Sequence, residues 1–354
     1  MKHKILSLII VFSMLLVSFT SFAETPSFVR DDILEKHLNE KISNLNPSTL
    51  NKLKSLGFPE ERIKYLSNKE IKEIVKNNYK FIGSSEDTIY LVLYKKDNNS
   101  NSDSYSCEKL ENGSIYSAMI PISKQEEKKY FQNKETFIEG IVNNLENISK
   151  QRNISVYKIT NGKKEESSLS NFKTKKSGGT TVTEHFDSGV LRFGINAYDM
   201  STSTKIKKKL GMDFSWSDMP YTFSRDVMAL SHTGVHVGIT DYYDYDASMK
   251  AYFMNKWSSV DNMIDADPEG HGLSASIDLP TANKCYGRAY IVIGNVKRHV
   301  DEGNYFFMVA KYGHVTKGYK LNPSIGIGSV GFSPSSSTKY DESDQVSLNS
   351  IKTY

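Results

Sequence analysis

The spacing of apolar side chains separates a helical first segment from a long β-rich remainder. Between residues 24 and 78, apolar positions recur every three or four residues, as at Leu34 and Leu38, which is typical of amphipathic helices. Ser67 and Glu70 have the spacing of a capping box, in which each side chain accepts a hydrogen bond from the backbone of the other residue. The pattern therefore predicts a compact unit of short helices over 24–78.

A mixed pattern follows between residues 79 and 160. Two apolar runs, 88–94 and 114–122, have the length and composition of β-strands. A second capping box starts a run with helical spacing over 123–149, and a short strand is expected at 154–159. This segment is predicted to be an α+β unit in which one long helix packs on a sheet.

The stretch 161–181 has no periodicity and predicts a linker, after which apolar and polar residues alternate in short runs. The strand candidates in this remainder are 191–198, 225–231, 235–239, 249–254, 273–279, 286–297, 304–316 and 325–332. Short strands without intervening helices predict an antiparallel β-sandwich over 182–333. The Ser-rich segment 334–354 predicts a flexible tail. The expected fold class is α+β, a small helical and α+β N-terminal region followed by an antiparallel β-sandwich.

The first 23 residues have the three parts of a secretory signal peptide. A basic start with Lys2 and Lys4 precedes an uncharged apolar run from Ile5 to Phe19, and Ala23 ends a motif of small residues for cleavage. The run is too short to span a membrane, and no later stretch is long and apolar enough. The sequence therefore predicts a protein secreted to the extracellular space after cleavage near Ala23, with no transmembrane segment in the mature chain.

The formal net charge of the chain limits the classes of partner that are expected. The formal net charge is +4, and two of these charges belong to Lys2 and Lys4 in the predicted signal peptide. So small an excess does not indicate a nucleic acid as the partner. The expected partner is therefore an unknown extracellular or cell-surface target.

The two cysteines of the chain are Cys107 and Cys285. In an exported protein they are compatible with a disulfide that joins the two halves of the chain. They are equally compatible with two free thiols, one in a loop and one in a strand. Both alternatives stay open at this point.

Histidines in the β-rich region suggest a zinc site. His232 and His236 are an even number of positions apart, so a continuous strand would place both on one face. His271 or His314 would then supply a further imidazole from another strand. The alternative is that these histidines line a polar face of the sheet.

A neighbouring acidic stretch suggests calcium. Asp265, Asp267 and Glu269, followed by Gly270, resemble the first half of a calcium loop, but Ser276 stands where the loop needs its last carboxylate. An acidic turn between strands explains the same residues. Calcium and zinc are therefore cofactor hypotheses only.

Aromatic residues supply a candidate ligand-binding surface. The candidates are Trp216, Tyr243, Tyr245 and Trp257. Aromatic side chains on the outward face of a strand can stack on sugars or insert at a membrane interface. The alternative is that they pack as cross-strand partners, because strands favour Tyr and Trp.

Part of the β-rich region resembles a family. The strand that contains Phe214 and Trp216 and ends near Pro220, followed by the Asp-led apolar strand 226–230, is similar to uncharacterised exported proteins of Bacillus-like Gram-positive bacteria. The resemblance implies export and a β-rich domain. The family has no established activity, so no functional residue is carried over from it.

Intact catalytic motifs do not accompany these candidates. The sequence contains no Gly-x-Ser-x-Gly elbow, no P-loop and no dinucleotide-binding glycine pattern, and no catalytic residue is predicted. The favoured function is a non-catalytic binding or interaction protein, surface-binding or toxin-like. The alternative is an extracellular hydrolase that acts on cell-wall or another polymer, with or without a metal ion. A third hypothesis makes the N-terminal region a pro-segment.

Overall fold

The computed structural model describes residues 30–85, 87–96, 114–152, 154, 156–160, 163–166, 176–177, 180–181, 186–219, 225–280, 282, 284–317, 321–334 and 339–354. The predicted signal peptide, Cys107 and most of the predicted linker lie outside these residues. Among the described helices, none combines the length and the apolar character that crossing a membrane requires.

The α-helices begin where the sequence carries capping signals. They are α2 (Arg30–Ser43), α3 (Pro47–Ser55), α4 (Glu60–Ile63), α5 (Asn68–Asn77), α6 (Lys124–Gln132), α7 (Lys134–Asn143) and α8 (Leu145–Gln151). Both predicted capping boxes form, Ser67 with Glu70 at α5 and Ser123 with Glu126 at α6. We call α2–α5 the helical unit.

The predicted long helix over 123–149 is wrong, because the chain forms α6, α7 and α8 instead. Asn133 has extended backbone angles, and its side chain accepts a hydrogen bond from the backbone N–H of Thr136. It therefore caps a new helix within the predicted run.

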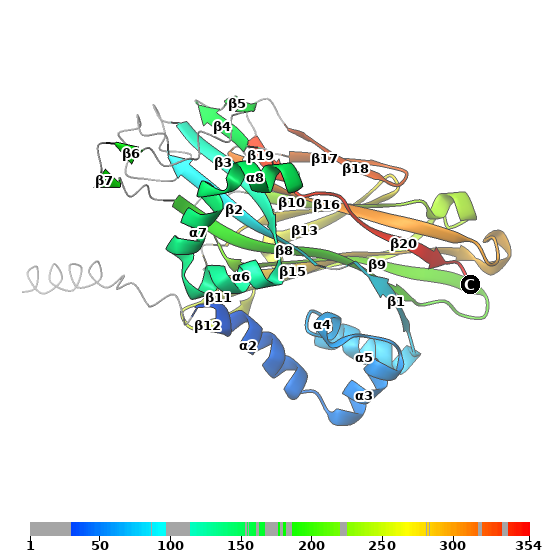
Figure 1. The fold of residues 1–354 in the computed structure, drawn as a ribbon. Helices are drawn as coiled ribbons and strands as arrows, with labels where there is room; N and C mark the ends of the chain where they lie inside the picture. Colours follow the sequence, from blue (N-terminus) through cyan, green and yellow to red (C-terminus); the bar gives the residue numbers. More distant parts are fainter. Residues whose placement is uncertain are drawn as a thin grey trace, which may run out of the picture.

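Two antiparallel sheets form the sandwich (Figure 1). The ten-stranded sheet contains β1 (Lys80–Ser84), β2 (Thr88–Lys96), β3 (Ser114–Ile122), β4 (Val156–Thr160), β5 (Lys163–Glu166), β8 (Phe186–Asp199), β9 (Lys205–Asp218), β11 (Asp241–Phe253), β12 (Lys256–Ser259) and β15 (Cys285–Val296). Its order is β12-β11-β15-β9-β8-β2-β3-β4-β5, with β1 paired to β8. The predicted α+β unit and the predicted sandwich thus share one sheet across the predicted linker.

The second sheet is six-stranded, and its order is β13-β14-β10-β16-β19 with β20 paired to β16. Its strands are β10 (Arg225–His232), β13 (Ile264–Glu269), β14 (Gly272–Asp278), β16 (Tyr305–Lys317), β19 (Lys339–Glu342) and β20 (Val346–Lys352). Smaller elements are β6 (Lys176–Ser177), β7 (Thr180–Thr181), β17 (Leu321–Gly326), β18 (Ser329–Pro334) and the 3-10 turns η4 (Gly234–Val237), η5 (Asp261–Met263) and η6 (Lys297–His299).

The predicted flexible tail is wrong for residues 339–354, because β19 and β20 extend the six-stranded sheet. Ile351 is fully buried, and the hydroxyl of Thr353 donates to the carbonyl oxygen of Asp301 at 2.7 Å. The few apolar residues of this segment therefore face the core, although its composition is mostly polar.

The main core lies between the two sheets, and helices cover the outer face of the ten-stranded sheet (Figure 1). Strand β2 shows why its apolar run does not alternate. Tyr90 and Val92 face the six-stranded sheet, whereas Leu91 and Leu93 pack with residues of α6–α8. Both faces of β2 are therefore buried. The predicted fold class, α+β with a β-sandwich, is confirmed.

Candidate functional site

The four aromatic residues predicted to bind a ligand are divided between different surroundings. Trp216 is fully buried between the sheets, and its indole N–H donates to the hydroxyl of Tyr312 at 3.1 Å. The prediction that Trp216 contacts a ligand is therefore wrong, because an inward position on β9 belongs to the core. The hydroxyl of Tyr312 in turn donates to Asp226 at 2.7 Å, which completes a buried polar cluster.

The other three candidates lie near the edge of the ten-stranded sheet. Tyr243 faces the ammonium group of Lys207, which lies 4.2 Å from the ring centroid. Tyr245 is 48% exposed on β11. Trp257 on β12 stacks on His37 of α2, with ring centroids 4.8 Å apart. Trp257 therefore holds the helical unit against the sheet, which the sequence did not indicate.

The proposed zinc ligands do not converge. Strand β10 ends at His232, which is buried and whose Nδ1 accepts a hydrogen bond from the backbone N–H of Gly234 at 3.1 Å. The chain then turns into η4, where His236 is exposed. The even spacing fails because the strand does not continue. His271 lies beside His232, because the backbone N–H of His232 donates a hydrogen bond to the backbone oxygen of His271.

The proposed calcium loop is a strand. Asp265, Asp267 and Glu269 belong to β13, where Asp265 pairs with Ser276 and Asp267 pairs with Ser274. An extended strand points its side chains outward and does not wrap them around an ion. In the part of the chain that the structure describes, no three His, Cys, Asp or Glu side chains form a group that could hold a metal.

Cys285 is a free thiol, fully buried on β15. Burial raises the pKa of this thiol, and the nearby Asp226 raises it further. The other half of the proposed disulfide, Cys107, lies outside the described residues.

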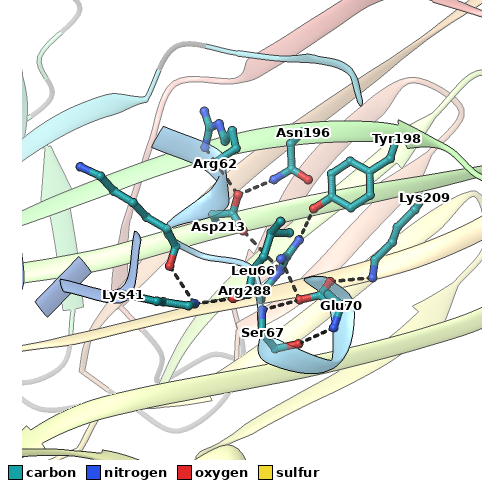
Figure 2. A network of polar contacts seen from close by, with 11 residues as sticks. Lys41, Arg62, Leu66, Ser67, Glu70, Asn196, Tyr198, Lys209, Asp213 and Arg288 are labelled. Carbon is teal, nitrogen blue, oxygen red and sulfur yellow. Dashed lines mark hydrogen bonds and ion pairs between the residues drawn. The ribbon is translucent and has the colours of Figure 1, made fainter. Parts of the chain in front are cut away.

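A buried ion-pair network joins the helical unit to the outer face of the ten-stranded sheet (Figure 2). Glu70 at the start of α5 lies 2.7 Å from Lys209 of β9 and 2.9 Å from Arg288 of β15. The same carboxylate accepts the backbone N–H of Ser67 in the capping box. Arg288 also donates to the hydroxyl of Tyr198. One carboxylate therefore starts a helix and pairs with two strands.

Asp213 of β9 occupies a second position in this network. Arg62 lies 3.5 Å from one oxygen of Asp213, and Arg288 lies 3.5 Å from the other. Asn196 donates a hydrogen bond to the same carboxylate. Arg62 also pairs with Asp87 at 2.8 Å, which links α4 to the start of β2.

The electrostatics of the two carboxylates differ in direction. Burial alone would raise the pKa of Glu70, but the charges of Arg288 and Lys209 outweigh it and lower the pKa to about 2. Burial raises the pKa of Asp213, and Arg288 and Arg62 only partly offset it. Glu70 is therefore the carboxylate that stays ionised, and its negative charge pairs with Lys209 and Arg288.

A cavity of about 160 Å³ lies beside this network, between the helical unit and the sheet. We call it the junction cleft. It is lined by Lys41, Tyr65, Ser67 and Asn68 from the helical unit, and by Ser248, Met249, Lys250, Ser259, Asp261, Tyr286, Gly287 and Arg288 from the sheet side. Because both layers contribute, the cleft exists only while the helical unit is docked.

Lys41 of α2 lines the cleft and also contacts the segment between α4 and α5. Its ammonium group donates to the carbonyl oxygens of Lys64, at 2.9 Å, and of Leu66 (Figure 2). Burial lowers the pKa of Lys41 to about 8, and the positive charges of Lys250 and Arg288 contribute to this shift.

Apart from Lys250, the charged groups in the rest of the cleft wall form ion pairs or hydrogen bonds. Asp261 is the single carboxylate among the lining residues, and it accepts hydrogen bonds from the backbone N–H of Met249 at 2.8 Å and from the hydroxyl of Ser259 at 2.7 Å. Tyr286 joins the cleft to Trp257, with ring centroids 5.3 Å apart. The lining can therefore donate hydrogen bonds and offer ring faces. Its one hydroxyl–carboxylate pair, Ser259 with Asp261, is tied to the backbone N–H of Met249 through the other oxygen of Asp261.

Sequence reasoning found only part of this site. The capping box at Ser67 and Glu70 locates one end of it, whereas Lys209 and Arg288 lie far away in the sequence. Nothing in the local pattern of β9 or β15 marks these two residues as partners of Glu70, because their pairing depends on where α5 docks.

Comparisons with protein-family models and with curated proteins found no match. Among solved structures, the chain is similar to a DUF4466 family protein from Parabacteroides merdae, at 10% identity and a TM-score of 0.23, over 45% of this chain and 44% of that one. It thus spans less than half of that protein. It is also similar to a structure described as a pore forming protein, at 10% identity and a TM-score of 0.26, over 50% of this chain and 96% of that one. The backbone pilin T6 of Streptococcus pyogenes matches at 10% identity and a TM-score of 0.25, over 74% of this chain and 61% of the pilin. Scores this low carry no argument about function.

Proposed function

We propose that the protein is an exported, non-catalytic binding protein, and that its ligand site is the junction cleft. The signal-peptide pattern of residues 1–23 supports export. The observation that carries the binding role is a cleft at the boundary of two structural layers, a common position for ligand sites.

The chemistry of the cleft favours binding over hydrolysis. A hydrolase needs an accessible nucleophile beside a base, or two accessible carboxylates. Glu70 and Asp213 are both buried in ion pairs. The single hydroxyl–carboxylate pair of the lining is Ser259 with Asp261, and among the described residues no imidazole or second carboxylate lines the cleft beside it. The donors of Lys41 and Lys250 and the rings of Tyr65 and Tyr286 suit recognition of a small molecule, or of one end group of an extracellular polymer.

The size of the cleft sets the size of the ligand. Cavities of ~150 Å³ accept a molecule of about the size of benzene. The cleft, at about 160 Å³, therefore fits one ring and not an extended polymer.

The experiment is a titration with a panel of single-ring compounds: glucose, glucosamine, glucuronate and benzoate. The fluorescence of Trp257, which contacts Tyr286 in the wall, and calorimetry report binding. A saturable signal from at least one compound, lost in Asn68→Phe, is the expected result, because Asn68 lines the exposed rim of the cleft.

The matched control is Lys69→Phe, which places the same side chain on the next residue of α5, outside the lining. It should leave binding unchanged. Lack of a saturable signal from all four compounds, or equal loss of binding in both variants, would contradict the proposed function.

A further inference from the structure

We infer that the ligand of the junction cleft is a small organic anion, a carboxylate carried on a ring of monosaccharide size. This inference rests on the proposed function and adds the chemical class of the ligand.

The lining of the cleft carries three positive groups, Lys41, Lys250 and Arg288, against one carboxylate, Asp261. Lys41 and Lys250 both line it, and among the described residues neither forms an ion pair. Arg288 also lines the cleft but is neutralised by Glu70 behind it. Like charges held together in a partly buried space repel one another, and a bound anion removes that repulsion.

Burial and neighbouring positive charges act together on two groups. Burial is the largest cause of the lowered pKa of Lys41, and Lys250 and Arg288 add to it, whereas Glu70 and Asp213 act against it. Burial likewise lowers the pKa of His37 on the same helix, with smaller contributions from Lys250 and Lys41, whereas Glu40 acts against them. His37 lies next to the cleft, because its Nε2 is 3.3 Å from the hydroxyl of Tyr286. The positive charges of Lys41 and Lys250, which both line the cleft without an ion-pair partner among the described residues, therefore disfavour each other, and a bound anion would relieve this repulsion.

The donors come from different directions. Lys41 approaches from α2, Lys250 from β11, and Asn68 stands at the first turn of α5. Lys41 has one N–H donor beyond the two that it gives to the carbonyl oxygens of Lys64 and Leu66. This donor, Lys250 and Asn68 reach the cleft from separate elements, so they can bind the two oxygens of one carboxylate while the rest of the ligand points elsewhere.

One side of the remaining wall is aromatic and apolar, whereas Ser67, Ser248, Ser259 and Asp261 make the rest of it polar. Tyr65 and Tyr286 lie at 73° to each other with ring centroids 6.1 Å apart, and Met249 completes this side. Ring faces at such an angle suit the flat, weakly polar face of a sugar or aryl ring. A bare inorganic anion would leave this side of the cleft unfilled, which is why the anion is inferred to carry a ring.

The test compares three probes by calorimetry on the full mature chain: glucuronate, its neutral counterpart glucose, and acetate, which has the carboxylate without the ring. Glucuronate is expected to bind at least tenfold more tightly than either of the others. Equal affinity for glucose and glucuronate would overturn the inference that the ligand is an anion and would leave the proposed function standing. Equal affinity for acetate and glucuronate would overturn the inference that the anion carries a ring. Binding of neither glucuronate nor benzoate would overturn the inference, and if glucose and glucosamine also fail, the proposed function falls with it.

Two variants locate the anion. Lys250→Gln should weaken glucuronate binding about tenfold, the loss expected for one charged hydrogen bond, and should leave glucose unaffected. Lys256→Gln is the matched control, because Lys256 is an exposed lysine on the neighbouring strand β12 that does not line the cleft. Since Lys250 is exposed, its replacement should not disturb folding. Equal effects of the two variants would show that the anion is attracted only by overall charge and would overturn the site.

Discussion

At the scale of single residues, Glu70 has the largest structural role in this molecule. It closes the capping box of α5, pairs with Lys209 of β9 and pairs with Arg288 of β15. All three charged groups are buried. A buried charge is tolerated only while its partners remain, so this network depends on every member.

The first prediction concerns this carboxylate. Glu70→Gln removes the negative charge and leaves Lys209 and Arg288 buried with less compensation. We expect the free energy of unfolding to fall by about 3–5 kcal/mol, the usual loss when one member of a buried ion pair is removed. Urea denaturation measures it. Glu73→Gln on the exposed side of the same helix is the control and should change stability by less than about 0.5 kcal/mol. Equal effects of the two variants would contradict the central role of Glu70.

The second prediction concerns Lys41 and the inferred anion. Its pKa of about 8 reflects burial together with Lys250 and Arg288, while Glu70 and Asp213 act in the opposite direction. Only the protonated amine attracts a carboxylate, so glucuronate affinity should be steady below about pH 8 and should fall up to about tenfold per pH unit above it. Calorimetry between pH 7 and 10 measures this dependence.

Lys41→Arg provides the control for that pH dependence, because a guanidinium stays charged throughout the range. The variant should bind glucuronate with an affinity that does not change between pH 7 and 10. A wild-type affinity that is equally flat would show that Lys41 does not contact the anion.

At the scale of elements, the sequence predicted where helices start more accurately than where helices and strands end. Both capping boxes form as expected, yet Asn133 divides the predicted long helix, because an Asn inside an apolar pattern can serve equally well as a cap. The even spacing of His232 and His236 fails for a similar reason. The chain leaves the strand at His232, and no residue type announces that departure unambiguously.

The third prediction concerns β20, which the polar composition of the C-terminal segment concealed. Ile351 is fully buried against the main core, whereas the neighbouring Lys352 is exposed. Ile351→Ala should lower the free energy of unfolding by about 2–5 kcal/mol, and Lys352→Ala by less than about 0.5 kcal/mol. Thermal and urea unfolding measure both. A small loss in Ile351→Ala would mean that β20 is dispensable for the sandwich.

At the scale of the whole molecule, the helical unit attaches to the sheet through charges as well as apolar contacts. Tyr198 of β8 joins the apolar core of the helical unit, and Leu34 and Leu38 of α2 pack with Tyr286. The ion pairs of Glu70 and Arg62 lie between these contacts. The stability of this attachment, and of the junction cleft that depends on it, should therefore vary with pH.

The fourth prediction is a loss of stability in acid. Glu70 has a folded pKa of about 2, below its ordinary value of 4.5, so the unfolded chain binds its proton first as pH falls. Its stabilising contribution is complete above about pH 4.5 and is lost progressively towards pH 2, up to roughly 3 kcal/mol. The raised pKa of Asp213 has the opposite sign and offsets part of this loss.

Urea midpoints at pH 6, 4.5 and 3 measure this loss, with Glu70→Gln as the reference. The variant has no carboxyl group at this position and should lose less stability in acid than the native chain. The same pH dependence in both proteins would show that Glu70 does not couple the helical unit to pH.

The amino-acid sequence alone determined the local features of this protein: the α+β fold class, the caps of α5 and α6, and most of the strands. These follow from contacts within a few residues, through side-chain periodicity and hydrogen bonds at helix ends. The tertiary structure decided which faces are buried. It placed Trp216 in the core and Trp257 under α2, turned the polar C-terminal segment into sheet strands, and brought Lys41, Lys250 and Arg288 around one cleft. Pairings such as Glu70 with Arg288 join residues distant in sequence, so they arise only when the helical unit docks on the sheet.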